Sequence, residues 1–87
     1  MTIHESSNFS RKFDKLVKRN PDLGEHIDRK LRLLLADRDY PSLRLHKIEV
    51  AGDAVWSMSI DLKIRILFSY VKDGILLFDI GDHDEVY

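Results

Sequence analysis

The chain has no cysteine, and its apolar residues never form a long uninterrupted run. Without cysteine there is no disulfide, no thiol nucleophile and no thiolate metal ligand, which is typical of a reducing compartment. The short apolar runs predict no membrane-spanning segment, so we expect no membrane partner. The N-terminus also lacks a basic region followed by an apolar one, which predicts no secretory signal and a cytoplasmic location.

An excess of positive charge is missing as well. The chain holds 14 Lys and Arg against 15 Asp and Glu, a net charge of −1 that by itself argues against a nucleic-acid-binding domain. The charges are unevenly spread, because residues 1–50 hold 11 Lys and Arg against 8 Asp and Glu, whereas residues 51–87 hold 3 against 7. Either ordinary solvated faces or a binding surface would give this asymmetry.

Several catalytic signatures are also absent from the sequence. There is no glycine-rich phosphate loop, no serine nucleophile elbow and no paired-carboxylate arrangement. The acidic ending GDHDEVY does not predict a metal site either, because consecutive residues of an extended chain point in opposite directions. What the composition does support is one globular domain spanning residues 1–87, with 44% hydrophobic and 33% charged residues.

The first half of this domain has the periodicity of two helices. Apolar residues recur on one helical face over about residues 8–19, with Ser6 or Ser7 available as N-cap. Asn20 and Pro21 then restart the pattern, which runs to about Asp37. One tight break between two helices predicts a helical hairpin.

Strand patterns surround the hairpin. Residues 2–6 predict a short edge strand, and residues 43–50 a connection or weak strand. From Trp56 onward apolar and polar residues alternate in three segments, which predicts an antiparallel meander with one apolar face. The predicted fold class is α+β: a short N-terminal strand, a helical hairpin and a three-strand antiparallel meander, with the helices packed on one face of the sheet.

The alternation also predicts how the strands pair. Pairing Phe68 with Phe78 and Ile66 with Ile80 leaves the loop 72–74, whose last residue is a glycine suited to a left-handed conformation. The same register places Arg65 opposite Gly81 and, if the strand continues, His83 on the side of Arg65. Pairing Met58 with Ile66 puts Ser59 beside Arg65 as well.

The sheet face away from the helices is therefore expected to carry Ser59, Arg65 and His83, with Lys63 at its rim and Tyr87 just beyond. An arginine can clamp a phosphate, a histidine can transfer protons near neutral pH, and a tyrosine can stack on a base. The plainer alternatives are a surface ion pair of Arg65 with Asp79 or Asp61, and a histidine in a polar tail.

His46 and the exterior of the first helix each allow two interpretations. His46 is either a loop contact or a second proton-transfer group. The exterior of the first helix is either an ordinary solvated surface or a patch that follows an RNA backbone. The candidate RNA contacts are Lys63, Ser59, Arg11, Lys12 and Lys15, and the same helix also carries Lys18 and Arg19.

The order of these segments resembles the RelE/ParE superfamily of bacterial toxins from type II toxin–antitoxin pairs, in its RelE/YafQ-like branch. The likeness covers nearly the whole chain and is carried by LHKIEVAGDAVWSMSIDLKIRILFSY followed by ILLFDIGDHDEVY. Its most specific parts are the arginine in KIRILF and the G-x-H-x-x-x-Y ending, His83 to Tyr87. The segment Leu45-His46-Lys47-Ile48 also resembles the H-x-L segment of the YafQ-like branch.

The resemblance implies a ribosome-dependent endoribonuclease that cuts mRNA in the ribosomal A site by attack of the ribose 2′-hydroxyl on the adjacent phosphate, without metal or cofactor. Carried over, Arg65 would stabilise phosphate charge, His83 would act as general acid or base, His46 would be a second such group, and Tyr87 would orient or stack on the substrate. The implied partners are the ribosome, mRNA and a cognate antitoxin that folds on binding.

Three features differ from the pattern of many active members: Ser59 stands where they carry a basic residue, Ile64 where they carry an aromatic, and the overall charge is near neutral. The alternatives are therefore a ParE-like inhibitor that acts on DNA gyrase by contact, a catalytically weak member that mainly binds its antitoxin, and a structural domain with no toxin role.

Overall fold

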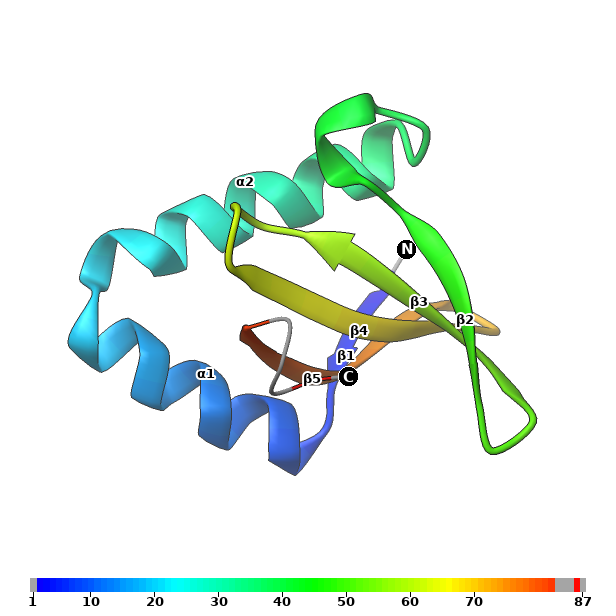
Figure 1. Cartoon of the computed structure of the whole chain (residues 1–87), viewed down its shortest axis with the longest axis horizontal. Helices are drawn as coiled ribbons and strands as arrows, with labels where there is room; N and C mark the ends of the chain where they lie inside the picture. The colour runs from blue at the N-terminus through cyan, green and yellow to red at the C-terminus, as the bar shows by residue number, and fades with distance from the viewer. Residues whose placement is uncertain (1, 83–85, 87) are drawn as a thin grey trace.

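Two helices pack on one face of a five-stranded mixed sheet in the computed structural model, which describes residues 2–82 and 86 (Figure 1). The sheet order is β1-β5-β4-β3-β2. The elements are β1 (Thr2–Glu5), α1 (Ser7–Arg19), α2 (Pro21–Ala36), the 3₁₀ turn η1 (Pro41–Leu43), β2 (His46–Val50), β3 (Asp53–Ser59), β4 (Ile64–Val71) and β5 (Gly74–Asp82). This confirms the predicted fold class, and the segment predicted as a connection or weak strand supplies β2.

The helical hairpin forms where the sequence predicts it. Ser6 is the N-cap of α1, and its hydroxyl accepts a hydrogen bond from the backbone N–H of Phe9 at 3.1 Å. Helix α2 begins at Pro21, where a missing N–H costs no intrahelical bond, after an Asn20 whose side chain makes no capping bond. The tight break lets both helices turn their apolar faces to the same sheet.

Strand β1 pairs in parallel with the first half of β5, at the edge of the sheet. Thr2 lies opposite Gly74, and a Cβ placed on Gly74 would collide with the backbone of Thr2. Gly74 is therefore needed for the close approach of β1, and its φ is not positive. The predicted left-handed glycine in a three-residue loop is wrong: Val71 pairs with Gly74, which leaves a two-residue turn.

The register of the meander was predicted in part. The confirmed pairs are Ile66 with Ile80, Arg65 with Gly81, Met58 with Ile66, and Ser59 with Arg65. The predicted pair of Phe68 with Phe78 is wrong, because a shift between Leu67 and Phe68 places Leu77 opposite Phe68. Phe78 is thus the extra residue of a β-bulge in β5.

The turn from β3 to β4 is closed without a glycine. The carboxylate of Asp61 accepts hydrogen bonds from the backbone N–H groups of Lys63 and Ile64, at 2.8 and 2.7 Å. An Asp that caps its own loop in this way replaces the conformational freedom that a glycine would supply.

The hydrophobic core lies between the helices and the sheet. Phe9 on α1, Ile27 on α2 and Phe68 on β4 are each 2% exposed or less. Trp56 on β3 is half-buried and packs against this cluster. Within the described ranges, no helix is both long and apolar enough to span a bilayer.

Candidate phosphate site on the outer sheet face

Arg65 projects from β4 on the face opposite the helices, because its neighbours Ile64 and Ile66 belong to the core side. We call this the outer face and define it by Ser57, Ser59 and Arg65. The Nε–H of Arg65 donates to the hydroxyl of Ser57 at 2.7 Å, and Ser57 is fully buried. A buried partner on the neighbouring strand fixes the direction of the guanidinium, which is what recognition of a phosphate in two-point fashion requires.

A second contact with Arg65 comes from the loop before β2. The Nη2 group of Arg65 donates to the carbonyl oxygen of Arg44 at 3.3 Å. Arg44 ends η1 in the left-handed region, with φ 45° and ψ 45°. A non-glycine residue there costs about 1–2 kcal/mol, so the surrounding structure must hold it. The preceding residue, Leu43, is fully buried and supplies that anchor.

His46 lies in the same cluster. Its Nδ1 is 3.4 Å from Nη2 of Arg65 and 3.3 Å from the carbonyl oxygen of Arg44. With a proton on Nδ1 the ring donates to the Arg44 carbonyl, and without it the ring accepts from Arg65. Nδ1 of His46 therefore lies between an acceptor, the Arg44 carbonyl, and a donor, the Arg65 guanidinium.

Ser59 lies opposite Arg65, as the register predicts. Its side chain is nonetheless 7% exposed, and its hydroxyl donates to the carbonyl oxygen of Asp61 at 2.8 Å. Lys63 is exposed in the same turn. Contacts of Ser59 and Lys63 with RNA stay predictions.

The acids that the sequence offered as ion-pair partners of Arg65 have other roles. Asp61 caps its turn, and Asp79 accepts a hydrogen bond from Lys12 on α1 at 2.5 Å. The predicted positions of His83 and Tyr87 lie outside the described residues. What the structure does place is Gly81, which pairs with Arg65 one residue before the end of β5.

Two other histidines contact the fold away from this cluster. His26 on α2 is half-buried, and its Nε2 lies 2.7 Å from the carbonyl oxygen of Ile60. Nε2 of His4 lies 3.0 Å from the carboxylate of Asp73. That hydrogen bond lowers the pKa of Asp73 below its ordinary value.

The basic surface of α1 borders a groove of about 370 Å³ against β5. Arg11 donates to the side-chain oxygen of Asn8 at 2.9 Å, and Lys12 is paired with Asp79. The cationic side chains along the groove are Arg11, Lys12, Lys15 and Arg19. Across residues 2–82 and 86, no three His, Asp or Glu side chains gather in a way that would hold a metal ion.

Sequence reasoning did not single out two members of the cluster. Ser57 shares the face of Arg65 by alternation, so the signal was present but was one of several serines on β3 and β4. The carbonyl of Arg44 left no signal, because a backbone group in an unusual conformation is not encoded by a side-chain pattern.

No protein-family model matches the chain, and no curated protein matches it in sequence. Solved structures do match it over nearly its whole length. A metal-bound toxin from Helicobacter pylori superposes with a TM-score of 0.85 at 19% identity, covering 100% of this chain and 99% of that one.

Two other toxins have the same architecture. YafQ from the Escherichia coli DinJ–YafQ complex gives a TM-score of 0.82 at 14% identity, covering 99% of this chain and 97% of that one. A YoeB/ParE toxin from Agrobacterium tumefaciens gives 0.80 at 12% identity, covering 95% and 99%. At these identities the likeness concerns the fold, and the fold of this chain is that of the RelE/YafQ-like toxins.

Proposed function

We propose that this protein is the toxin of a type II toxin–antitoxin pair and acts as an endoribonuclease on mRNA bound to the ribosome. The observation that carries the proposal is the outer-face cluster, in which Arg65 is held by Ser57 and Arg44 beside His46. The toxin fold supports the proposal without deciding the activity.

The chemistry follows from these groups. A general base removes the proton of the ribose 2′-hydroxyl, and the resulting oxygen attacks the adjacent phosphorus. Arg65 stabilises the additional negative charge on the phosphate oxygens as the P–O5′ bond breaks. A general acid protonates the departing 5′-oxygen, leaving a 2′,3′-cyclic phosphate and a 5′-hydroxyl. His46 and His83 are the two proposed proton-transfer groups, and Tyr87 is proposed to orient or stack on the RNA.

The proposed partners are the ribosome, mRNA and an antitoxin that folds on the toxin surface. Arg11 and Lys15 on α1, together with Lys63 and Ser59, are the proposed RNA contacts. Such contacts position the backbone and carry little sequence information. Lys12, predicted as a further RNA contact, is paired with Asp79.

The test is to express the protein without an antitoxin and to map new mRNA 5′ ends during growth arrest. The wild type is compared with Arg65→Ala, His46→Ala and His83→Ala, and with Asp28→Asn as a control, because Asp28 forms an exposed ion pair with Arg32 on α2. New ends within reading frames that disappear with Arg65→Ala and His83→Ala are expected. Purified protein should leave a 2′,3′-cyclic phosphate on ribosome-bound mRNA.

Growth arrest with intact mRNA and altered DNA supercoiling would contradict the proposal and indicate a gyrase inhibitor. No arrest and no cleavage in any condition would also contradict it. Cleavage that survives Arg65→Ala would place the active site elsewhere on the protein.

A further inference from the structure

We infer that Lys12 and Asp79 form a clasp between α1 and β5 that positions the end of β5 against Arg65. Both are then positioning residues for cleavage, and the inference rests in this respect on the proposed function. Strand β1 covers the edge of β5 only as far as Leu77, which pairs with Glu5 and accepts a hydrogen bond from the backbone N–H of Ser6 at 2.9 Å.

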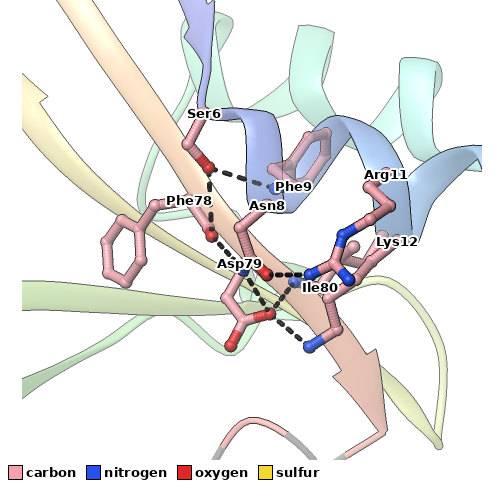
Figure 2. Close-up of polar contacts among 8 residues, drawn as sticks. All are labelled: Ser6, Asn8, Phe9, Arg11, Lys12, Phe78, Asp79 and Ile80. Atoms are coloured by element: carbon pink, nitrogen blue, oxygen red, sulfur yellow. Dashed lines mark hydrogen bonds and ion pairs between the residues drawn. The ribbon is translucent and has the colours of Figure 1, made fainter.

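Beyond Leu77 the first turn of α1 replaces β1 along β5. The hydroxyl of Ser6 and the side-chain amide of Asn8 both donate to the carbonyl oxygen of Phe78, at 3.2 and 2.9 Å (Figure 2). Phe78 is the bulged residue, so its carbonyl lies where the regular ladder is interrupted. The start of α1 is thereby tied to the bulge.

The next residue along β5 is tied to the same helix. One carboxylate oxygen of Asp79 accepts from Nζ of Lys12 at 2.5 Å, from the amide of Asn8 at 3.3 Å and from the backbone N–H of Ile80 at 2.9 Å. Figure 2 shows these contacts converging on Asp79 from the helix and from the strand itself. This single oxygen thus connects Lys12 and Asn8 on α1 with the backbone of Ile80, and these contacts fix the direction of β5 after the bulge.

Burial distinguishes this pair from a surface ion pair. The side chains of Lys12 and Asp79 are 25% and 21% exposed, whereas those of Arg32 and Asp28 on α2 are 80% and 61% exposed. Removing one member of a partly buried pair leaves the other charge without its partner in a poorly solvated place. We therefore expect substitution of Lys12 or Asp79 to have a clear effect, and substitution of Arg32 or Asp28 to have little.

The clasp lies close to the proposed site along the chain. Gly81, two residues after Asp79, pairs with Arg65, and the chain then continues to His83. Because a bulge changes the twist and direction of its strand, the contacts that fix the bulge also fix where the residues after it lie relative to Arg65. Lys12 would thus act on cleavage through Asp79 rather than by touching RNA.

Lys12 as an RNA contact and Lys12 as a positioning residue predict different results for Asp79→Asn. If Lys12 is an RNA contact, loss of the Asp79 charge frees a cation and tightens RNA binding. If Lys12 is a positioning residue, the same substitution weakens the clasp and slows turnover with binding unchanged.

The experiment measures kcat and KM for cleavage of ribosome-bound mRNA by Lys12→Met, Asp79→Asn and the exchanged pair Lys12→Asp with Asp79→Lys. We expect each single variant to lower kcat about tenfold with KM changed less than about twofold, and the exchanged pair to recover part of the loss. Asp28→Asn is the matched control and should behave like the wild type. Unchanged kcat in both single variants, or a higher KM for Lys12→Met with a lower one for Asp79→Asn, would overturn the inference.

A second measurement separates failure of the clasp from failure of the proposed function. The Nε–H of Arg65, bonded to Ser57, can be followed by NMR whether or not the protein cleaves RNA. In Asp79→Asn and Lys12→Met, with the fold intact by circular dichroism, this signal should shift and exchange faster with solvent, and in Asp28→Asn it should not. An unchanged Arg65 signal would overturn the inference, whereas a wild type that never cleaves would overturn only the proposed function. Lys12→Met keeps most of the lysine stem, so it carries the test if Asp79→Asn does not fold.

Discussion

At the scale of single residues, the outer face shows how the small, buried side chain of Ser57 can set the geometry of the larger, half-buried side chain of Arg65. Arg65 would sample many rotamers if its guanidinium were free of the sheet. The hydrogen bond from its Nε–H to Ser57 restricts the side chain, and its Nη2 group donates to the Arg44 carbonyl. Preorganisation of this kind is what makes a cation effective on a charge that appears only in the transition state.

Under the proposed function, Ser57→Ala is predicted to slow cleavage by about tenfold or more, because a hydrogen bond to a charged group is worth about 1.5–3 kcal/mol. Binding of RNA should change much less, since the positive charge remains. Single-turnover cleavage of ribosome-bound mRNA measures the effect. Ser69→Ala on β4 is the control, because the hydroxyl of Ser69 makes only a long 3.5 Å contact with the Ala54 carbonyl. Equal loss in both variants would contradict a special role for Ser57.

The pair of His4 and Asp73 gives a prediction about pH. The hydrogen bond from His4 lowers the pKa of Asp73 from 3.8, so the folded protein binds this proton less readily than the unfolded chain. The stabilising contribution is thus present above that value and is lost as the pH falls through the lowered pKa. Asp73→Asn should reduce the melting temperature slightly at about pH 5 and not at about pH 2.

The measurement is thermal unfolding of both proteins across this range, with an NMR titration of the Asp73 carboxyl group. His4→Ala should return that pKa toward 3.8, because the hydrogen bond that lowers it is removed. If His4→Ala leaves the pKa of Asp73 unchanged, another group must be the cause of its lowering.

At the scale of secondary-structure elements, the parallel pairing of β1 with β5 depends on a residue without a side chain. A methyl group on Gly74 has no room beside the backbone of Thr2, whereas one on Gly24 of α2 would make ordinary contacts 3.6 Å from Val17. Gly74→Ala should destabilise the protein by about 1–3 kcal/mol, as overpacking does. Gly24→Ala should stabilise it by about 0.5–1 kcal/mol, because alanine is the better helix former.

Urea unfolding of the two variants tests this difference in sign. The same substitution at two glycines controls for the general effect of alanine on the unfolded chain. A Gly74→Ala protein as stable as the wild type would show that β1 can move away from β5 at no cost.

The elements also show what the sequence could and could not predict. The helices and the pair of Ile66 with Ile80 followed from strong periodicity. In the strands, a one-residue slip would have moved the apolar side chains to the wrong face of the sheet. The bulge at Phe78 was missed because it lies in a continuous apolar run, Ile75 to Phe78, in which two registers bury equally apolar side chains. Strand β2 was ambiguous because an edge strand rich in charge lacks clear alternation.

The candidate site was predictable to the same extent. The positions of Ser59 and Gly81 opposite Arg65 followed from the register, but the bond to Ser57, the Arg44 carbonyl and the pairing of Lys12 with Asp79 did not. The former is a backbone group in a rare conformation, and the latter joins residues 67 positions apart that only the packing of α1 on β5 brings together.

At the scale of the whole molecule, a net charge of −1 coexists with local concentrations of positive charge. Cationic side chains line the groove beside α1, but the pairing of Lys12 with Asp79 reduces the net positive charge there. Long-range attraction of RNA should therefore be weak, and binding should depend on a few close contacts.

This gives a prediction for the salt dependence of RNA binding. If Arg11, Lys15, Arg19, Lys63 and Arg65 are the main phosphate contacts, the slope of log affinity against log salt concentration should be about −3.5 for single-stranded RNA, at about −0.7 per contact. Arg19→Gln should make the slope shallower by about 0.7. Lys30→Gln should leave it unchanged, because Lys30 lies on α2 and donates to Ser42. Fluorescence anisotropy with an uncleavable 2′-O-methyl RNA measures these slopes, and a slope that Arg19→Gln does not alter would remove the α1 groove from the RNA-binding surface.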